Sequence, residues 1–348
     1  MTKNQVTLGI DIGGTNTVFG FVDRMGNCYA DSSILTNAHQ SSEIFFDRLQ
    51  KKVKILFSNL QGKYEFKGIG IGAPNANYYK GTIENPPNLS WEYVNVLEEL
   101  GKFFEVPVSV TNDANVAALG EMMFGAAQGM KNFIVITLGT GLGSGIVANG
   151  ELILGSDGFA GEIGHTIVDP KGRECGCGRR GCLEAYSSAT GLRRTVQELM
   201  CTKTMSSELR NISYEQLTSR MIYEAAVRGD RMALDAFEVT GQVLGMKLAD
   251  SVAHLSPEAI ILLGGLAAAG DLIFKPTKRA LEENLFGIFK NKVALLPSAI
   301  AEGKAAILGA SALIWNDLEK KNKPSWMRML SNGTKENREK ATASTLQK

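Results

Sequence analysis

The stretch Val6–Asp23, VTLGIDIGGTNTVFGFVD, contains two short apolar runs joined by the turn Gly13-Gly14-Thr15. Apolar runs of this length around a glycine turn predict an antiparallel β-hairpin. Residues 133–153, FIVITLGTGLGSGIVANGELI, repeat the design, again with glycines between two apolar runs. The duplicated hairpin predicts two related α/β domains that face each other.

The remaining stretches fit around these hairpins as strands and helices. We expect a helix over residues 41–60, a buried strand ending in a loop over 68–79, a strand, turn and helix over 106–127, helices between 187 and 254, a strand running into a Gly-Gly turn over 258–270, and a last helix over 301–315. The tail from about Asn316 is polar and charged, which predicts fraying or disorder. The predicted domains are a small one of residues 1–117 and 303–320 and a large one of residues 118–302, followed by a disordered tail of residues 321–348.

The chain has 348 residues, more than one hydrophobic core usually organises, which agrees with two domains. The 37 basic and 36 acidic residues give a net charge of +1, so no charge excess indicates a nucleic acid or an anionic membrane as partner. No apolar run approaches the roughly 20 residues of a transmembrane helix, and the first residues lack the apolar stretch of a secretion signal. We therefore expect a cytoplasmic protein with reduced thiols, in which clustered cysteines favour a metal site over disulfides.

Three glycine turns each follow an apolar strand: residues 11–16 (DIGGTN), 138–143 (LGTGLG) and 263–266 (LGGL). Glycine lets backbone N–H groups approach a phosphate, threonine hydroxyls add donors, and Asp11 is available for a Mg²⁺ shell. A P-loop is excluded because no Gly-Lys pair precedes Ser or Thr, and spacing and strand context exclude a dinucleotide fingerprint. The three turns together favour a nucleotide triphosphate site over simple tight hairpin turns.

Asp113 lies in residues 111–115, TNDAN, just after a predicted strand and at the start of a predicted helix. Phosphoryl transfer to an alcohol requires positioning, charge neutralisation and a carboxylate that accepts the hydroxyl proton. A carboxylate here is held on a rigid element, and the neighbouring Asn112 can donate to a polyol. The alternative is that Asp113 only caps the helix, and from the local sequence alone that is the more frequent role. The cap is expected at Asn112 or Asp113.

Three of the five cysteines and one of the three histidines lie in residues 164–186, GHTIVDPKGRECGCGRRGCLEAY. His165, Cys175, Cys177 and Cys182 supply one imidazole and three thiols, the complete tetrahedral set of a structural Zn²⁺ site. The intervening glycines suit a tight turn around an ion, and metal binding would stabilise a loop without a core of its own. The alternative is three reduced cysteines beside an unrelated histidine. It is disfavoured because these polar, basic surroundings are a poor place to bury cysteine.

Together, DIGGT, TNDAN, LGTGLGSGI followed by GFAGEIGH, and CGCGRRGCLE resemble the ROK family of sugar kinases and repressors, over roughly residues 6–315. The resemblance implies the actin–hexokinase (ribonuclease H-like) type of fold, in which two α/β domains close a cleft over ATP and a sugar. With no room for a helix-turn-helix ahead of Val6, we expect the enzyme branch. Family members are often dimers or tetramers, so a homo-oligomer is also implied.

The resemblance implies roles for individual residues, with ATP and Mg²⁺ as cofactors. Asp113 is implied as the base for the sugar 6-hydroxyl. The implied sugar-binding residues are Asn85, Asn112, Glu162, His165 and Glu184, and the implied ATP- and Mg²⁺-binding residues are Asp11, Gly13, Gly14, Thr15, Thr140, Gly141, Gly264 and Gly265, the last two on the adenosine side. His165 would bind zinc through one ring nitrogen and the sugar through the other, so that the metal fixes the loop that presents the sugar ligands.

Two residues depart from the family pattern. Asn16 stands where many members carry lysine, which removes a positive charge beside the first glycine turn. Asn75 stands after Ala73-Pro74, where a glycine is usual. Residues 182–191, CLEAYSSATG, look like the glucokinase members. Phosphorylation of glucose at O6 is therefore the expected reaction, and N-acetylmannosamine, N-acetylglucosamine, fructose and allose remain open as substrates.

Two other classes of function compete with a kinase. A non-catalytic sugar sensor would keep the binding residues without turnover, but the intact Asp113 and both glycine loops argue against it. A nucleic-acid-binding zinc finger would use Arg173, Arg179 and Arg180. Three arginines on one loop are expected to form a solvated face instead, and the neutral net charge disfavours nucleic acid.

Overall fold

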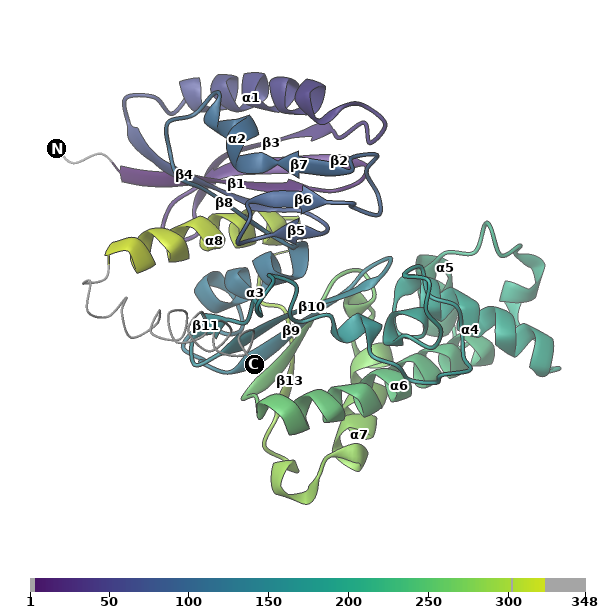
Figure 1. Cartoon of the computed structure of the whole chain (residues 1–348). Coiled ribbons are helices and arrows are strands. Elements are labelled where there is room, and N and C mark those ends of the chain that lie inside the picture. Colours follow the sequence, from purple (N-terminus) through teal and green to yellow (C-terminus); the bar gives the residue numbers. More distant parts are fainter. Residues whose placement is uncertain (1–3, 302, 323–348) are drawn as a thin grey trace, which may run out of the picture.

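The computed structural model describes residues 4–301 and 303–322 (Figure 1). Of the tail predicted to be disordered, residues 323–348 lie outside the described part. The prediction that the chain frays from Asn316 is wrong as far as Asn322, because helix α8 (Ala305–Asn322) continues through this segment. Among the described residues, no helix is both long and apolar enough to cross a membrane.

The first sheet has five strands in the order β3-β2-β1-β4-β8. They are β1 (Asn4–Ile12), β2 (Asn16–Val22), β3 (Cys28–Leu35), β4 (Tyr64–Gly72) and β8 (Val108–Thr111). β1 and β2 form the predicted antiparallel hairpin, while β4 runs parallel to β1 and to β8. The central strands are buried on both faces because α1 (Ser42–Ser58) covers one face and α8 the other (Figure 1).

The second sheet repeats this arrangement in the order β11-β10-β9-β12-β13. Its strands are β9 (Phe133–Leu138), β10 (Leu142–Ala148), β11 (Glu151–Leu152), β12 (Ala259–Leu263) and β13 (Ala294–Pro297). β9 and β10 form the second predicted hairpin, and β12 runs parallel to β9 and β13. Each sheet therefore has a hairpin strand at its centre, antiparallel neighbours on one side and parallel neighbours on the other. The predicted duplication is confirmed.

Helices α3 (Asp113–Phe124) and α8 lie between the two sheets (Figure 1). α8 packs on β1 and β4, and α3 packs on both α8 and β10. Glycines allow these elements to pack closely. A Cβ added at Gly70 of β4 would lie 1.8 Å from the carbonyl oxygen of Ala310 in α8, and one added at Gly309 of α8 would lie 2.5 Å from that of Val116 in α3. The predicted domain boundary between residues 117 and 118 falls inside α3, and the domain limits stay a prediction.

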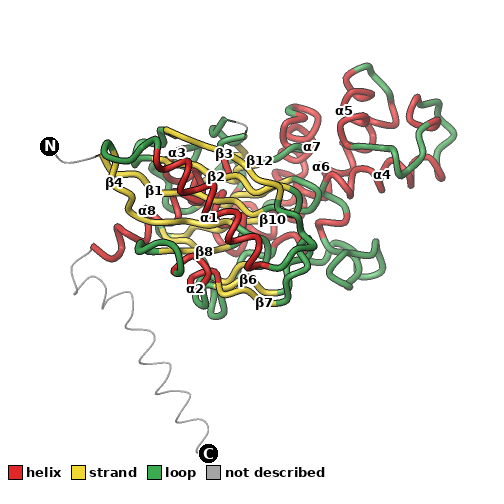
Figure 2. The backbone as a smooth tube through the Cα atoms, turned by 90° about the horizontal axis from the view of Figure 1, so that it is seen from above, coloured by secondary structure: helices red, strands yellow, loops and turns green. Residues whose placement is uncertain are grey.

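The helices between residues 189 and 284 pack beside the second sheet, and the first two of them, α4 and α5, extend away from both sheets (Figures 1 and 2). These helices are α4 (Ala189–Thr202), α5 (Ser219–Val227), α6 (Arg231–Leu255) and α7 (Asp271–Asn284). A small sheet of β5 (Ala76–Asn77), β6 (Thr82–Glu84) and β7 (Tyr93–Asn95), with α2 (Val96–Gly101), accompanies the first sheet. The described residues also contain the short 3₁₀ turns η1 (Ile163–His165), η2 (Leu183–Ala185), η3 (Glu208–Asn211), η4 (Ala267–Ala269) and η5 (Gly287–Phe289).

Candidate functional site

The first glycine loop (residues 13–16) joins β1 to β2 and is braced by Thr36. The backbone N–H of Gly13 donates to the Asn16 carbonyl at 3.1 Å, and Thr36 donates through its N–H to Thr15 and through Oγ1 to the Gly13 carbonyl, at 2.9 and 2.7 Å. Because Thr36 donates hydrogen bonds to carbonyls of the loop, the loop is held in one conformation, while Thr15 and Asn16 remain exposed. A fixed loop of half-buried glycines followed by an exposed threonine suits anion binding.

The second glycine loop (residues 139–141) joins β9 to β10 and is held by the start of α4. The N–H of Ala189 donates to the Gly139 carbonyl and Thr190 Oγ1 donates to the Thr140 carbonyl, both at 2.9 Å. Gly141 leaves room for a carboxylate: a Cβ there would lie 2.3 Å from Oε2 of Glu184. The same carboxylate oxygen accepts the N–H of Leu142 at 2.9 Å.

Asp113 is the first residue of α3, and Asn112 is the cap. The Asn112 side-chain oxygen accepts the N–H of Asn115 at 2.7 Å, which leaves its Nδ2 without a partner among the described residues. Asp113 is open to solvent on one side, and its Oδ1 accepts the N–H of Ala114 at 2.9 Å. Protein packed around the remaining sides raises the pKa of the Asp113 carboxyl, against the lowering effect of that backbone hydrogen bond.

Two further carboxyl groups lie close enough to Asp113 for its negative charge to raise their pKa. Burial, and then the charge of Asp113, raises the pKa of Asp11 to about 7. Burial also raises the pKa of Glu162, which precedes η1; the neighbouring His165 lowers this pKa, while Asp113 and Glu184 raise it. The structure therefore brings together acidic residues of β1, α3 and η2 and the residue before η1. Along the chain they are separated by up to 173 positions, from Asp11 to Glu184.

The four predicted zinc ligands converge: the ligand atoms of His165, Cys175, Cys177 and Cys182 all lie within 4.8 Å of one another. His165 Nδ1 is 3.7 Å from Cys175 Sγ, and the sulfurs of Cys177 and Cys182 are 3.6 Å apart. In a tetrahedral site with zinc–sulfur bonds of about 2.3 Å, sulfurs are about 3.8 Å apart, so this donor set fits zinc. The other ring nitrogen of His165, Nε2, faces Glu162 Oε2 at 4.0 Å.

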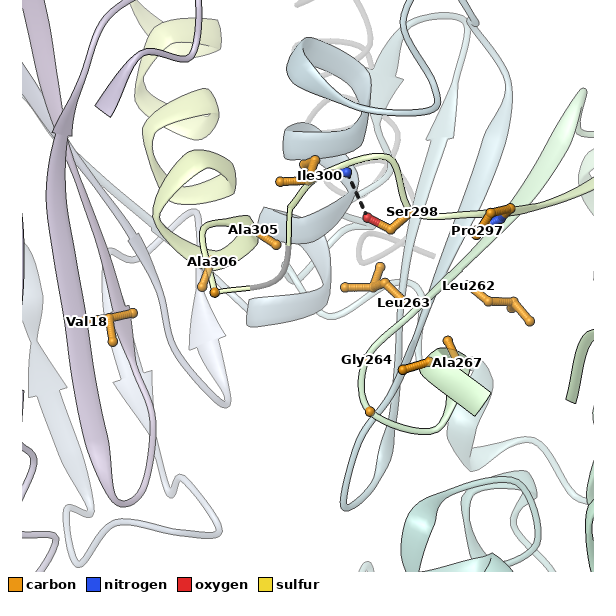
Figure 3. Close-up of a pocket in the computed structure, with 13 residues that line it drawn as sticks. Val18, Leu262, Leu263, Gly264, Ala267, Pro297, Ser298, Ile300, Ala305 and Ala306 are labelled. Atoms are coloured by element: carbon orange, nitrogen blue, oxygen red, sulfur yellow. Dashed lines mark hydrogen bonds between the residues drawn. The ribbon is translucent and has the colours of Figure 1, made fainter. Parts of the chain in front are cut away.

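An apolar pocket of about 490 Å³ lies between the two sheets, beside the turn that follows β12 (Figure 3). Val18 of β2, Gly264 and Gly265 of the turn, and Ala305 and Ala306 of α8 contribute to its lining. Gly264 has a φ of 99°, and a Cβ there would lie 2.6 Å from a backbone oxygen of β9, so only glycine fits this turn. Both glycines predicted on the adenosine side are thus at a pocket large enough to enclose part of a ligand.

Asn85 is the predicted site residue with the least support from the geometry. It is exposed and left-handed (φ 46°), and its carbonyl accepts Nδ2 of Asn75 at 2.8 Å. Asn75 itself has a φ of 52°, which explains the departure from glycine, because Asn tolerates this conformation better than other residues. Sequence reasoning missed Asn88 in the same segment, whose Cβ lies 2.8 Å from the position of a Cβ on Gly14. The segment ENPPNLSW (residues 84–91) pointed to an asparagine near the site, but its sequence does not show which of the two asparagines lies against the glycine loop.

The prediction of a solvated face for the three loop arginines is wrong for Arg173. Its side chain is only 9% exposed, whereas that of Arg180 is 57% exposed. The reason is that Arg173 finds carbonyl, hydroxyl and carboxylate partners on η2 and α4.

The chain is similar to known proteins over most of its length. The model of the ROK family matches residues 7–317. A glucokinase of Halalkalibacterium halodurans is 38% identical over 281 residues, which cover 79% of this chain and 84% of that protein. A xylose repressor of Caldicellulosiruptor bescii is 30% identical over 294 residues, 83% of this chain and 72% of the repressor. The crystal structure of a ROK family glucokinase from Streptomyces griseus in complex with glucose and AMPPNP has a TM-score of 0.74 and 33% identity, over 88% of this chain and 98% of that one. These similarities confirm the predicted actin–hexokinase type of fold.

Proposed function

The chain belongs to the ROK family, and from this premise we propose that it is a sugar kinase that transfers the γ-phosphoryl group of ATP to the 6-hydroxyl of glucose. One observation carries the proposal. The carboxyl of Asp113 lies within electrostatic range of Asp11, beside the first glycine loop, and of Glu162, on the segment that bears the metal ligands. A carboxylate between a candidate phosphate loop and a candidate polyol site is what phosphoryl transfer to an alcohol requires.

In the proposed reaction, the sugar O6 attacks the γ-phosphorus in line with the departing ADP. The O6–phosphorus bond forms, the bond from the γ-phosphorus to the bridging oxygen breaks, and Asp113 accepts the O6 proton. Burial raises the pKa of Asp113, which strengthens its carboxylate as a base for the O6 proton. The cap made by Asn112 holds the helix start in place, and the free Nδ2 of Asn112 is available to a sugar hydroxyl.

The nucleotide is proposed to lie along the two glycine loops and into the pocket. Gly13, Gly14 and Thr15 face one side of the triphosphate, Thr140 and Gly141 face the other, and the adenosine occupies the pocket beside Gly264-Gly265, whose lining is mostly apolar. The 33% identical Streptomyces griseus glucokinase, solved with glucose and AMPPNP, supports a nucleotide triphosphate as the ligand. When bound, Mg²⁺ would neutralise charge on the phosphates, and Asp11 is the carboxylate available to hold it.

The sugar is proposed to bind between Asn112, Glu162, His165 and Glu184. These carboxylates, amide and imidazole suit a neutral polyol, because each hydroxyl both donates and accepts. When bound, zinc would engage Nδ1 of His165 and so direct Nε2 toward the sugar and Glu162. The similarity to proteins named glucokinase supports glucose.

A coupled assay with Mg-ATP and a panel of sugars tests the proposal. Glucose is expected to give a much higher kcat/KM than N-acetylglucosamine, N-acetylmannosamine, fructose or allose. A reversed ranking rejects glucose and keeps the kinase, whereas no turnover with any sugar rejects the kinase. Asp113→Asn is expected to lower kcat by about 10³-fold or more while glucose binding, measured by calorimetry, persists.

The second candidate is a sugar-binding regulator without turnover, and the observation that favours it is the 30% identical xylose repressor. The two candidates differ in one measurement. A regulator would bind a sugar in calorimetry with similar affinity in the wild type and in Asp113→Asn, and neither protein would consume ATP.

A further inference from the structure

Arg173 is the first residue of the cysteine loop (residues 173–182). Its side chain is largely buried, whereas those of Arg179 and Arg180 in the same loop are exposed. Its Nε and Nη2 donate to the two carboxylate oxygens of Glu198, at 2.8 and 2.7 Å. Nη1 donates to the carbonyls of Ala185 and Gly191, at 3.0 and 3.1 Å, and Nη2 also donates to Thr195 Oγ1 at 3.0 Å. All these partners lie on η2 and α4. A guanidinium with this many directed hydrogen bonds is held in one orientation.

The rest of Arg173 is fixed as well. Its guanidinium carbon lies 4.4 Å from the ring centroid of Tyr186, and its backbone N–H donates to the hydroxyl of that tyrosine at 3.0 Å. Its carbonyl accepts the N–H of Gly181 at 2.7 Å, which closes the base of the cysteine loop. Arg173 therefore connects the base of this loop to the helix that follows it.

The zinc ligands do not make this connection. All four, from His165 to Cys182, lie before η2, so a metal would hold the loop together internally without attaching it to α4. Glu184 lies between the last metal ligand, Cys182, and Ala185, whose carbonyl Arg173 binds. The backbone is thus held on each side of Glu184, while its carboxylate accepts the N–H of Leu142.

We propose that Arg173 is a positioning residue for sugar binding: it orients the metal-bearing loop on α4 and thereby places Glu184 in the site. This inference rests on the proposed function. The second glycine loop should be affected less, because Ala189 and Thr190 hold it through contacts in which Arg173 takes no part. The expected signature is therefore a loss on the sugar side with the nucleotide side retained.

The test compares Arg173→Lys with Arg180→Lys. Lysine keeps the charge but cannot reproduce a planar fork with this many donors. Arg180 is the matched control, since it lies on the same loop and its guanidinium contacts only the exposed Glu174 among the described residues. For each variant we would measure zinc per chain, glucose affinity by calorimetry, and the KM values for glucose and ATP.

For Arg173→Lys we expect the glucose Kd and KM to rise about tenfold or more, with the ATP KM within about twofold and zinc retained at the wild-type amount. Arg180→Lys should match the wild type. Equal rises of the glucose and ATP KM values, a loss of zinc that parallels the loss of affinity, or kinetics like those of Arg180→Lys would each overturn the inference.

Glu198→Ala provides a second variant in case Arg173→Lys does not fold. It removes the two hydrogen bonds to a partner that is itself 59% exposed and leaves the other three. We expect a smaller rise of the glucose Kd, about threefold, and an unchanged Kd would contradict the role of Arg173. Because calorimetry needs no turnover, a wild type without kinase activity would reject the proposed function while the binding comparison still decides on Arg173.

Discussion

The half-buried carboxyl of Asp11 should make the folded protein less stable as the pH rises. Its pKa is raised from 3.8 to about 7 by burial and by the charge of Asp113, and no described residue donates a hydrogen bond to it. Between these two pH values the folded chain binds a proton that the unfolded chain releases. The stabilisation from this proton is complete below pH 3.8 and is lost as the pH rises through about 7. Replacing the carboxylate by an amide removes this cost.

The structure sets the size of the effect. The two pKa values differ by about three pH units, and each unit corresponds to about 1.4 kcal/mol, which gives about 4 kcal/mol. Solvent relaxation around a half-buried carboxyl reduces this value, so we expect Asp11→Asn to raise the free energy of unfolding by about 2 to 4 kcal/mol at pH 8. At pH 6, where the folded carboxyl already holds its proton, the gain should be smaller by about 1 kcal/mol.

Urea unfolding followed by circular dichroism, in buffer without Mg²⁺, measures both values. Asp23→Asn is the control of opposite sign: burial alone would raise the pKa of Asp23, but hydrogen bonds from Asn27, Tyr29 and Met25 lower it, so its ionised form stabilises the fold. Asp23→Asn should therefore be destabilising at pH 8. The reasoning fails if Asp11→Asn destabilises the protein at pH 8, or if its gain is the same at pH 6. Kinase activity should fall in the Asp11 variant in spite of the added stability, because Asp11 is the proposed Mg²⁺ ligand.

Two further substitutions test the contact of Glu184 with the second glycine loop and the binding of zinc by the cysteine cluster. Gly141→Ala would place a methyl group against Oε2 of Glu184, the end of a flexible side chain. We expect the free energy of unfolding to change by less than about 1 kcal/mol and the glucose KM to rise about tenfold. An unchanged glucose KM in steady-state kinetics would refute the contact. Cys182→Ser removes a buried ligand of the metal cluster, so mass spectrometry should find less than about a tenth of the wild-type zinc. The exposed Cys201→Ser serves as control, and equal zinc in both variants would rule out the cluster as the metal site.

The sequence predicted the parts of the fold in which local signals agree. Glycine between apolar runs predicted both hairpins, and the asparagine before Asp113 was one of the two expected caps, because capping needs only residues within one turn. The duplicated hairpin also predicted two related α/β domains, and the two sheets share the same arrangement of strands. The roles of the single site residues, the domain limits, the location in the cell and the expected dimer or tetramer remain predictions.

The end of α8 was missed because its polar residues have distant partners. Asp317 accepts hydrogen bonds from Tyr78 at 2.8 Å and from Ser109 at 2.5 Å, and Glu319 pairs with Arg24. No local sequence pattern reveals such distant partners, so a polar segment at the end of a helix is predicted to be a disordered tail. Arg173 was misjudged for the same reason, since its partners lie 12 to 25 residues further along the chain.

Helix α3 gives the site an asymmetry between its nucleotide and sugar sides. It begins at Asp113, and two turns later the buried Glu121 accepts hydrogen bonds from Ser298 Oγ, at the lining of the pocket, and from the N–H of Ala126. The proposed base and one wall of the proposed adenosine pocket are therefore fixed to one rigid element, at a separation of about 12 Å along the helix axis. Glu162 and Glu184 instead reach the site beside and within the short 3₁₀ turns η1 and η2, without an α-helix or strand of their own. In our proposals, zinc and Arg173 hold these short turns in position, so losing either should weaken sugar binding while leaving the nucleotide side in place.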